Sequence, residues 1–369
     1  MPGITEKLLT DTLNQRIEAR CKEIRGVLES ESRNATLVLG AGINASAGLP
    51  TWDGLLARLI TIRSAMLSPS EESFPLALPT KDEYYRSKNV FPDVDVLEVA
   101  EYIRGISTVK GNSRAEMEEL KFIVREALKP KEEDYAHDFL SERALGCAAK
   151  LAARHFQACR DEKRFRNRSV ITFNYDDLLE HYAESFLKIK AQAVYDGKEI
   201  DWAANLHVYH PHGFLPITGS TGESSKKIVL SEDSYYDLER YAYSWENFVV
   251  VRALQDSTCV FCGFSGNDFN FKRIIRHLPP PMSDNPRHYL LVTINSIVDE
   301  LSEVKTKLSK IGSVSEMDKL KISKEKLEAC LCMKEEYWKS KGFIPVWTTY
   351  HQKPDLDDLH VLLKSLAEP

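Results

Sequence analysis

A glycine-rich turn directly after a short apolar run is the feature that most narrows the choice of fold. Residues 36–39 are apolar or β-branched, Gly40, Ala41 and Gly42 follow at once, and the tract ends in Gly48-Leu49-Pro50. Such a turn after a strand is typical of nucleotide-binding sheets, because glycine permits a tight bend and lets backbone amides face a pyrophosphate. The third glycine of the dinucleotide fingerprint is missing at its usual spacing, so the turn alone fits a purely structural role about as well.

Short apolar runs recur along the chain and alternate with stretches of helical periodicity. We expect strands at 36–39, 169–173, 206–210, 227–231, 258–264, 288–294 and 343–347. Several of them are apolar throughout, as strands covered on both faces of a parallel sheet are. The pattern predicts an α/β fold, a Rossmann-like doubly wound parallel sheet with an inserted helical subdomain.

The organisation of the chain follows from where strands are missing. We expect an N-terminal amphipathic helix within 1–34 and one α/β domain over 35–369, with a helical insertion at about 54–168 and a charged helical segment at about 296–340. A last helix at 355–366 is expected to pack back on the sheet. A helical block between a first strand and its partner is a common way to build a lid over a nucleotide-binding sheet.

The charge balance argues against nucleic acid as a direct partner, and the lack of long apolar stretches argues against a membrane. The net charge is −6 and the isoelectric point is near 6.0, so no global basic field attracts nucleic acid. The basic run at 160–168 is more often a solvated face than a phosphate-binding stripe. No stretch approaches the roughly 18 apolar residues of a membrane span, and the amino-terminal residues lack a signal peptide's apolar segment. We therefore expect a cytoplasmic protein.

The seven cysteines do not predict a disulfide framework or a metal site. An odd number without a secretion signal favours reduced thiols. Cys259 and Cys262 lie three apart in an apolar run, where a strand sends them to opposite faces. Cys330 and Cys332 have no second close pair to complete a tetrahedral zinc site. Buried structural thiols are the better interpretation of both pairs, and we expect no metal.

Two polar residues follow one of the predicted strands. Asn174 and Asp176 come directly after the strand at 169–173, where open α/β sheets gather their ligand contacts. Asn174 suits holding ribose hydroxyls or a water, and Asp176 suits a ribose or carboxamide contact. Taken without other motifs, both residues fit a turn and helix cap equally well.

His212 is the best candidate for a general base, because imidazole titrates near neutral pH and Gly213 leaves room beside it. With His207 and His210 it also forms a histidine cluster, which raises the alternative of a metal site. On a strand, His210 and His212 would share a face while His207 points away, and no Asp or Glu lies within the run. His207 and His210 are therefore better interpreted as core or edge residues.

Four motifs in order resemble those of the sirtuin-like family of NAD-consuming enzymes. They are Gly40-Ala41-Gly42 with Gly48-Leu49-Pro50 and an aromatic residue, the strand-end Thr172-Phe173-Asn174-Tyr175-Asp176, the pair His212-Gly213, and Gly263-Phe264-Ser265-Gly266-Asn267-Asp268. The second and fourth have the form found in a bacterial branch of the family. The chain lacks the zinc module with two Cys-x-x-Cys pairs of protein-deacylating sirtuins, and Thr51-Trp52-Asp53 replaces their aromatic-Arg element.

The resemblance implies a sirtuin-like catalytic domain that cleaves NAD to nicotinamide and ADP-ribose, with NAD as its substrate. It implies catalytic roles for Asn174, which positions ribose or water, and His212, which accepts a proton. It places the pyrophosphate on the glycine turn and the adenosine half near Ser265 and Asp268. The residues that the motifs assign to NAD binding are Gly40, Ala41, Gly42, Asn44, Pro50, Trp52, Asp53, Asp176, Gly263, Ser265 and Asp268.

The same bacterial branch implies a biological setting. Its members are NAD hydrolases of anti-phage defence, and a stand-alone chain of this length resembles the subunit paired with a HerA-type ATPase, or alternatively with a short Argonaute. A large homo-oligomer built through the amino-terminal helix or the 296–340 segment is then expected. Two other functions stay open, an NAD-dependent protein deacylase and a catalytically silent nucleotide-binding scaffold for a partner.

Overall fold

The computed structural model describes most of the sheet and the helices around it. The described residues are 4–30, 34–45, 47–67, 96–105, 111–129, 143–156, 168–201, 203–218, 223–241, 243–266, 268–278, 288–292, 329, 331–347 and 358–367. Most of the charged 296–340 segment and nearly all of the basic 160–168 run lie outside them, although 331–339 is helical. None of the described helices is long and apolar enough to cross a membrane.

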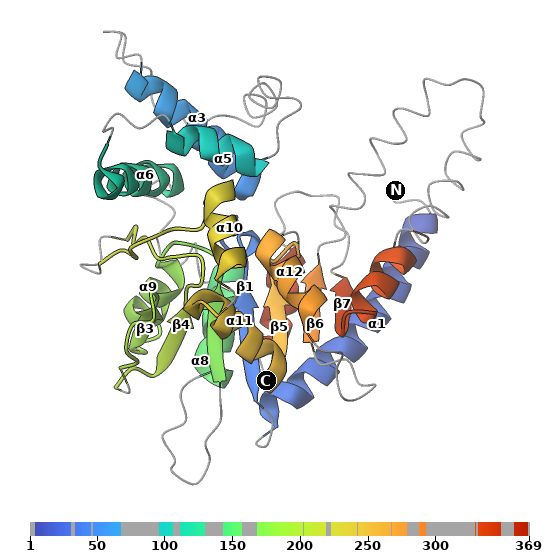
Figure 1. Ribbon diagram of the computed structural model, residues 1–369. Helices are drawn as coiled ribbons and strands as arrows, with labels where there is room; N and C mark the ends of the chain where they lie inside the picture. Colours follow the sequence, from blue (N-terminus) through green and yellow to red (C-terminus); the bar gives the residue numbers. More distant parts are fainter. Residues whose placement is uncertain are drawn as a thin grey trace, which may run out of the picture.

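The centre of the molecule is a parallel sheet (Figure 1). Its strands are β1 (Ala35–Leu39), β2 (Arg168–Thr172), β3 (Ala191–Val194), β4 (Leu206–Tyr209), β5 (Thr258–Cys262), β6 (His288–Val292) and β7 (Phe343–Trp347). Their spatial order is β3-β4-β2-β1-β5-β6-β7, and every pair is parallel. This is the expected Rossmann-like doubly wound α/β fold.

The strand order reverses direction at β1. On one side of β1 lie β2, β4 and β3, in that spatial order. The chain then returns to the other side of β1 and adds β5, β6 and β7. β1 is paired with β2 through Leu39↔Thr172 and with β5 through Leu39↔Cys262, so all three strands end level with one another. In an open α/β sheet, the crevice at such a switch point is where ligands bind.

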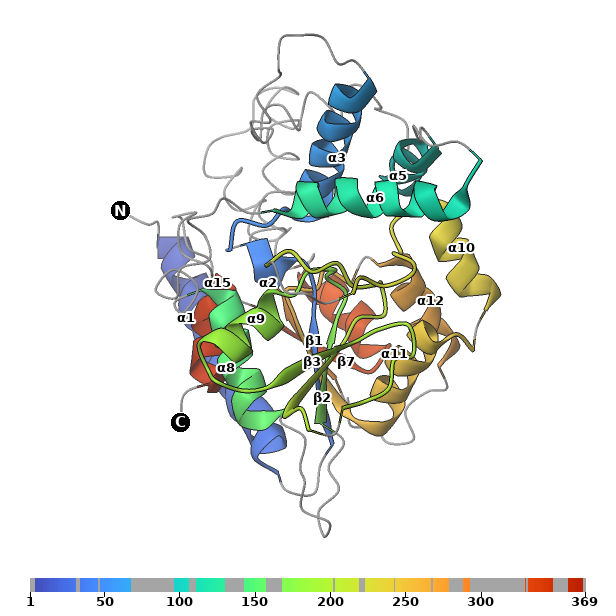
Figure 2. The same ribbon diagram turned by 90° about the vertical axis from the view of Figure 1, so that its left-hand side faces the viewer.

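Helices cover both faces of the sheet (Figure 2). One face carries α1 (Ile4–Glu29), α8 (Ala144–His155), α9 (Leu178–Ser185) and α15 (Asp358–Ala367), and the other carries α11 (Trp245–Asp256) and α12 (Phe269–His277). Successive residues of β1 serve the two cores in turn, since Leu37 and Leu39 pack on the first face and Val38 on the second. The expected packing of the last helix against the sheet is confirmed, because Leu363 of α15 is fully buried in the first core.

A separate group of helices lies beyond the carboxyl ends of the strands. It comprises α3 (Trp52–Leu67), α5 (Val96–Gly105) and α6 (Ser113–Leu128), drawn above the sheet in both views. The buried Arg63 joins them, because its guanidinium pairs with Glu119 at 3.0 Å and donates to the carbonyl of Ile103. Their apolar core also takes in Tyr175 from the loop after β2, so these helices pack directly over the strand ends.

Two strand assignments needed correction. The run 227–231 is not a strand, although Ile228 and Leu230 are buried. Its apolar side chains face two neighbouring clusters rather than a sheet, and Val229 donates only to the carbonyl of His212, at 2.9 Å. β3 escaped the sequence analysis because Ala191–Val194 is short and weakly apolar. The opposite placement of Cys259 and Cys262 is confirmed, since they lie in the cores on different faces.

Candidate active site

The turns after β1 and β5 meet backbone to backbone at the switch point. The amide of Gly40 donates to the carbonyl of Cys262 at 3.0 Å, and that of Gly42 to the carbonyl of Gly263 at 2.9 Å. A Cβ on Gly40 would lie 2.5 Å from the Gly263 oxygen, and one on Gly263 would lie 2.4 Å from the Ile43 nitrogen. These glycines are thus required by the contact between the turns. Because two of the amides are used inside the protein, their contact with a pyrophosphate stays a prediction.

Asn174 is held at the end of β2 by three different elements. Its Nδ2 donates to the carbonyl of Gly40 at 3.2 Å, and its backbone amide donates to Oγ1 of Thr172 at 3.1 Å. Its carbonyl accepts from Nδ1 of His210 at 3.1 Å. Within the described residues, Oδ1 of Asn174 makes no hydrogen bond, and the residue is only half-buried. The side chain is therefore oriented firmly while one polar atom is left for a ligand.

Asp176 and Asn44 bond to each other. Nδ2 of Asn44, on the short helix α2 (Gly42–Ala45), donates to Oδ2 of Asp176 at 2.7 Å, and both residues are buried. Oδ1 of Asp176 also accepts from the amide of Leu178. Burial, aided by the nearby Asp177 and Glu180, raises the pKa of Asp176 to about 7. This pair clamps the glycine turn to the loop after β2, and a direct contact of either residue with NAD stays a prediction.

His210 and His212 do not share a face, contrary to the expectation from strand alternation. β4 ends at Tyr209, and the chain then turns, with the amide of Gly213 donating to the carbonyl of His210 at 3.1 Å. His210 points to Glu180 on α9, with 2.7 Å between Nε2 and Oε1. Burial alone would lower the pKa of His210, but the Glu180 carboxylate and the Asn174 carbonyl raise it above the ordinary value. His210 is a core residue, as expected.

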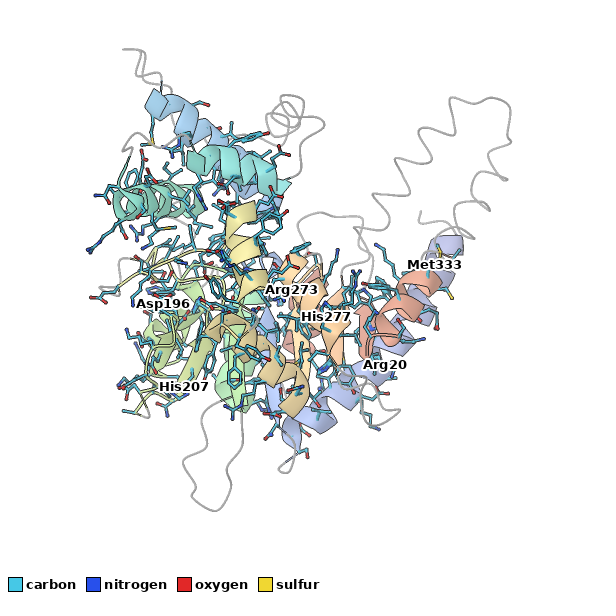
Figure 3. All side chains as sticks on the ribbon, viewed as in Figure 1. Arg20, Asp196, His207, Arg273, His277 and Met333 are labelled. Carbon is cyan, nitrogen blue, oxygen red and sulfur yellow. The ribbon has the colours of Figure 1, made fainter. Side chains whose placement is uncertain are left out.

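His207 points away from this site, as expected for a residue on the other side of the strand. Its Nε2 lies 3.1 Å from the carbonyl of Asp201. Figure 3 shows it at the opposite end of β4 from the site, and Asp196, which follows β3, toward the site end. Among the residues that the structure describes, no group of His, Cys, Asp and Glu has the arrangement of a metal site.

His212 points toward the other side of the sheet, at the start of α12. Its ring meets Phe173 edge-on, with the centroids 4.8 Å apart, and its Nε2 lies 3.6 Å from Oδ2 of Asp268. Nε2 is fully buried and has no hydrogen-bond partner in the described part of the chain. Burial lowers the pKa of His212, although the Asp268 and Glu246 carboxylates act in the opposite direction. At neutral pH the ring is uncharged and can accept a proton.

Tyr235 completes this side of the site, although no sequence pattern predicts it. It lies on α10 (Glu232–Arg240), and its hydroxyl donates to Oδ2 of Asp268 at 2.7 Å. Its ring also meets His212 edge-on, with the centroids 5.7 Å apart. Asp268 is the N-cap of α12 and accepts from the amide of Phe271. No motif marks Tyr235, because the contact depends on how α10 folds over the strand ends.

The other residues predicted to bind NAD differ in how deeply they are buried. Ser265 is exposed in the loop after β5, Pro50 is half-buried, and the half-buried Trp52 packs against the core of the α3, α5 and α6 helices. The side chain of Asp53 is outside the described part of the structure. Asp268 lies beside His212, with 3.6 Å between Oδ2 and Nε2, and its expected place near the adenosine half of NAD stays a prediction. The stretch Gly263–Asp268 thus reaches the candidate catalytic residues.

A cavity of about 720 Å³ is lined in part by His212. Its walls come from α5, α6, α10, the turn 210–213 and the start of α11, including Glu246 and Trp245. The residues lining it do not include Asn174, the glycine turn or Asp268. His212 therefore lines this cavity and also lies beside Asp268, which is not one of the lining residues.

A comparison with known families points to the same part of the chain. A family model described as a SIR2-like domain matches residues 168–311, a range that begins at β2 and includes Asn174, His212 and Asp268. The match covers less than half of the chain and excludes β1 with its glycine turn. No curated protein matches the chain. Over residues 168–311 the protein is thus similar to the SIR2-like domains, which are typically NAD-dependent enzymes.

Proposed function

We propose that this protein is an NAD glycohydrolase, which cleaves NAD to nicotinamide and ADP-ribose. The observation that carries the proposal is the buried, unbonded Nε2 of His212 at the carboxyl edge of a doubly wound sheet. Leaving a buried polar atom without a partner costs about 1–3 kcal/mol, so such an atom is a candidate for contact with a ligand. The similarity of residues 168–311 to SIR2-like domains supports NAD as that ligand.

In the proposed reaction the protein forms no covalent bond with NAD. The bond between C1′ of the ribose and the nicotinamide nitrogen breaks, and its electron pair neutralises the positive charge of the ring. The oxygen of a water molecule bonds to C1′, and its proton goes to Nε2 of His212, from which it passes to solvent. The products are nicotinamide, ADP-ribose and a proton. Catalysis then rests on orienting the bond and placing the water.

Asn174 is the residue that we assign to this placement. One hydrogen of its Nδ2 is donated to the Gly40 carbonyl, which orients the amide, and its Oδ1 can accept from a ribose hydroxyl or from the attacking water. The anchoring on β1, β2 and β4 keeps that oxygen in place without help from the ligand. Preorganised groups of this kind lower the barrier because they need no rearrangement during the reaction.

Hydrolysis is favoured over protein deacylation by the cysteines. The only Cys-x-x-Cys pair in the sequence is Cys259 and Cys262, and the two side chains lie in different cores. Burial raises the pKa of Cys259 to about 12, which opposes the thiolate form that binds zinc. A deacylase would convert an acyl-lysine peptide and NAD to O-acyl-ADP-ribose, and we expect none.

We further propose a role in NAD depletion during anti-phage defence, as a homo-oligomer with a HerA-type ATPase or, alternatively, a short Argonaute. The motif resemblance supports this setting, and an unregulated NAD hydrolase would harm its own cell. Co-purification of the tagged chain with the product of a neighbouring gene tests the pairing. A chain that hydrolyses NAD but binds neither partner would limit the proposal to the enzymatic activity.

The activity is tested by incubating the purified full chain with NAD, alone and with its partner, and measuring nicotinamide and ADP-ribose. His212→Ala and Asn174→Ala should each lower turnover about 100-fold or more. His277→Ala is the matched control, because His277 is exposed at the end of α12 (Figure 3). Undiminished turnover in both site variants would refute the assignment. Binding of NAD without nicotinamide release would favour the scaffold alternative.

A further inference from the structure

Tyr235 and His212 compete for one oxygen atom. Oδ2 of Asp268 accepts the hydroxyl of Tyr235 at 2.7 Å, and the same oxygen is the nearest carboxylate atom to Nε2 of His212, at 3.6 Å. The second oxygen, Oδ1, is engaged by the amide of Phe271 at 2.6 Å. The carboxylate thus has good hydrogen bonds without the imidazole.

The consequence of this competition concerns the protonation of His212. If Nε2 donated to an ionised Asp268, the ring would hold its proton there and could not accept another at that atom. An opposite charge within about 4–6 Å favours the charged form of an ionisable group, usually by one to three pKa units. Asp268 already exerts part of this effect at 3.6 Å, and a direct hydrogen bond from Nε2 to its carboxylate would raise the pKa of His212 further and favour the protonated, inactive base.

From this geometry we infer that Tyr235 keeps Asp268 from pairing with His212 and so leaves Nε2 of His212 free to accept a proton. Tyr235 is a positioning residue, since it acts through Asp268. Its own proton is secure, because burial and the Asp268 charge raise the pKa of the Tyr235 hydroxyl well above its ordinary value. The catalytic consequence rests on the proposed role of His212 as base, whereas the competition itself does not.

The other groups around His212 do not supply this effect. On α11, Glu246 is close enough for its charge to oppose the lowering of the His212 pKa, as Asp268 does from α12. Tyr175, from the loop after β2, donates instead to the carbonyl of Val229 at 2.5 Å. Phe173 contributes only an edge-on ring contact. Tyr235 is the group that bonds directly to the oxygen nearest Nε2.

The experiment is a pH titration of His212 in the full chain by imidazole NMR, with its signal assigned from the spectrum of His212→Ala. Tyr235→Phe keeps the ring contacts with His212 and Phe269 and removes only the hydroxyl. We expect the His212 midpoint to rise by about one pH unit. Tyr236→Phe is the control, because Tyr236 is exposed and bonds to Glu232.

A second variant identifies the carboxylate. Asp268→Asn should leave the His212 midpoint at or below that of the unaltered chain, and adding Tyr235→Phe to it should produce no rise. A midpoint that stays constant or falls in folded Tyr235→Phe would overturn the inference. So would a rise of the same size in the Asp268→Asn background.

Nicotinamide release from NAD separates this inference from the proposed function. The acid limb of the pH–rate profile should move to higher pH in Tyr235→Phe, with about a tenfold loss of rate below both midpoints. A raised midpoint without turnover in any chain would uphold the inference and refute the glycohydrolase. Turnover with an unchanged midpoint and profile would do the reverse.

Discussion

Two histidines on either side of Pro211 show how differently one turn can use the same side chain. Both ring nitrogens of His210 face acceptors, the Asn174 carbonyl and the Glu180 carboxylate. Nε2 of His212 makes no hydrogen bond to any described residue, and its nearest carboxylate atom, Oδ2 of Asp268, lies 3.6 Å away. A carbonyl can only accept, so Nδ1 of His210 carries a proton, and the adjacent carboxylate favours a second one on Nε2. His210, with both ring nitrogens bonded, has a structural role, whereas His212 keeps its Nε2 available for the reaction.

The largest effect of a single substitution is expected for Glu180→Gln, which removes the carboxylate that pairs with His210. Removing one member of a buried ion pair typically costs about 3–5 kcal/mol, because the remaining charge stays uncompensated. We expect a loss of about 3 kcal/mol in the free energy of unfolding, measured by urea denaturation. Glu199→Gln, at an exposed position, should change it little. If Glu180→Gln is as stable as this control, the pair is not what holds the turn.

A second effect, spread over several pH units, should appear in the pH dependence of stability. The pKa of Asp176, raised to about 7, lies above the value of an unfolded carboxyl, so the folded state binds the extra proton. Its contribution is full below the unfolded pKa and is lost as pH rises through the folded one, by up to about 1.4 kcal/mol per pH unit. Asp176→Asn should flatten that decline, measured by denaturation from pH 4 to 8, roughly the span of the two pKa values.

The control for that series is Asp237→Asn, since Asp237 is more than half exposed. This control should reproduce the slope of the unaltered chain. If Asp176→Asn leaves the slope of the free energy of unfolding against pH unchanged, the extra proton of the folded state is bound by a group other than Asp176.

The smallest effect is expected at His212 itself. Replacing an unpaired buried polar group by an apolar one of similar size can be nearly neutral, so His212→Leu should alter the free energy of unfolding by about 1 kcal/mol or less. His210→Leu should cost about 3 kcal/mol, because Glu180 would stay buried without a partner. Equal losses in the two variants, measured side by side in urea, would erase the distinction between the histidines.

The sequence predicted the sheet well because its strands are apolar on both faces, a local property. It also brought Asn174 and His212 to the same edge, since the carboxyl ends of parallel strands lie together. It failed where tertiary contacts decide. The buried run 227–231 does not pair with any described strand. The predicted strand at 206–210 ends at Tyr209 instead, so the direction of His210 is set by the following turn and not by strand alternation.

Tyr235 and Glu180 illustrate the same limit within the site. Each lies on a helix whose sequence reads as an ordinary amphipathic pattern, and each gains its role from a residue more than 25 positions away, Asp268 or His210. Nothing local distinguishes Tyr235 from the exposed Tyr236 beside it. Only the packing of α10 over the strand ends separates them.

The contact between the turns after β1 and β5 has a consequence for how this protein can change over time. The two turns meet through main chain at Gly40, Gly42 and Gly263, where an added methyl group would collide with a neighbouring backbone atom. Because these positions tolerate no larger side chain, mutation cannot easily reshape the contact between the turns. Changes in ligand preference must therefore come from the residues around the two turns, while this contact stays the same.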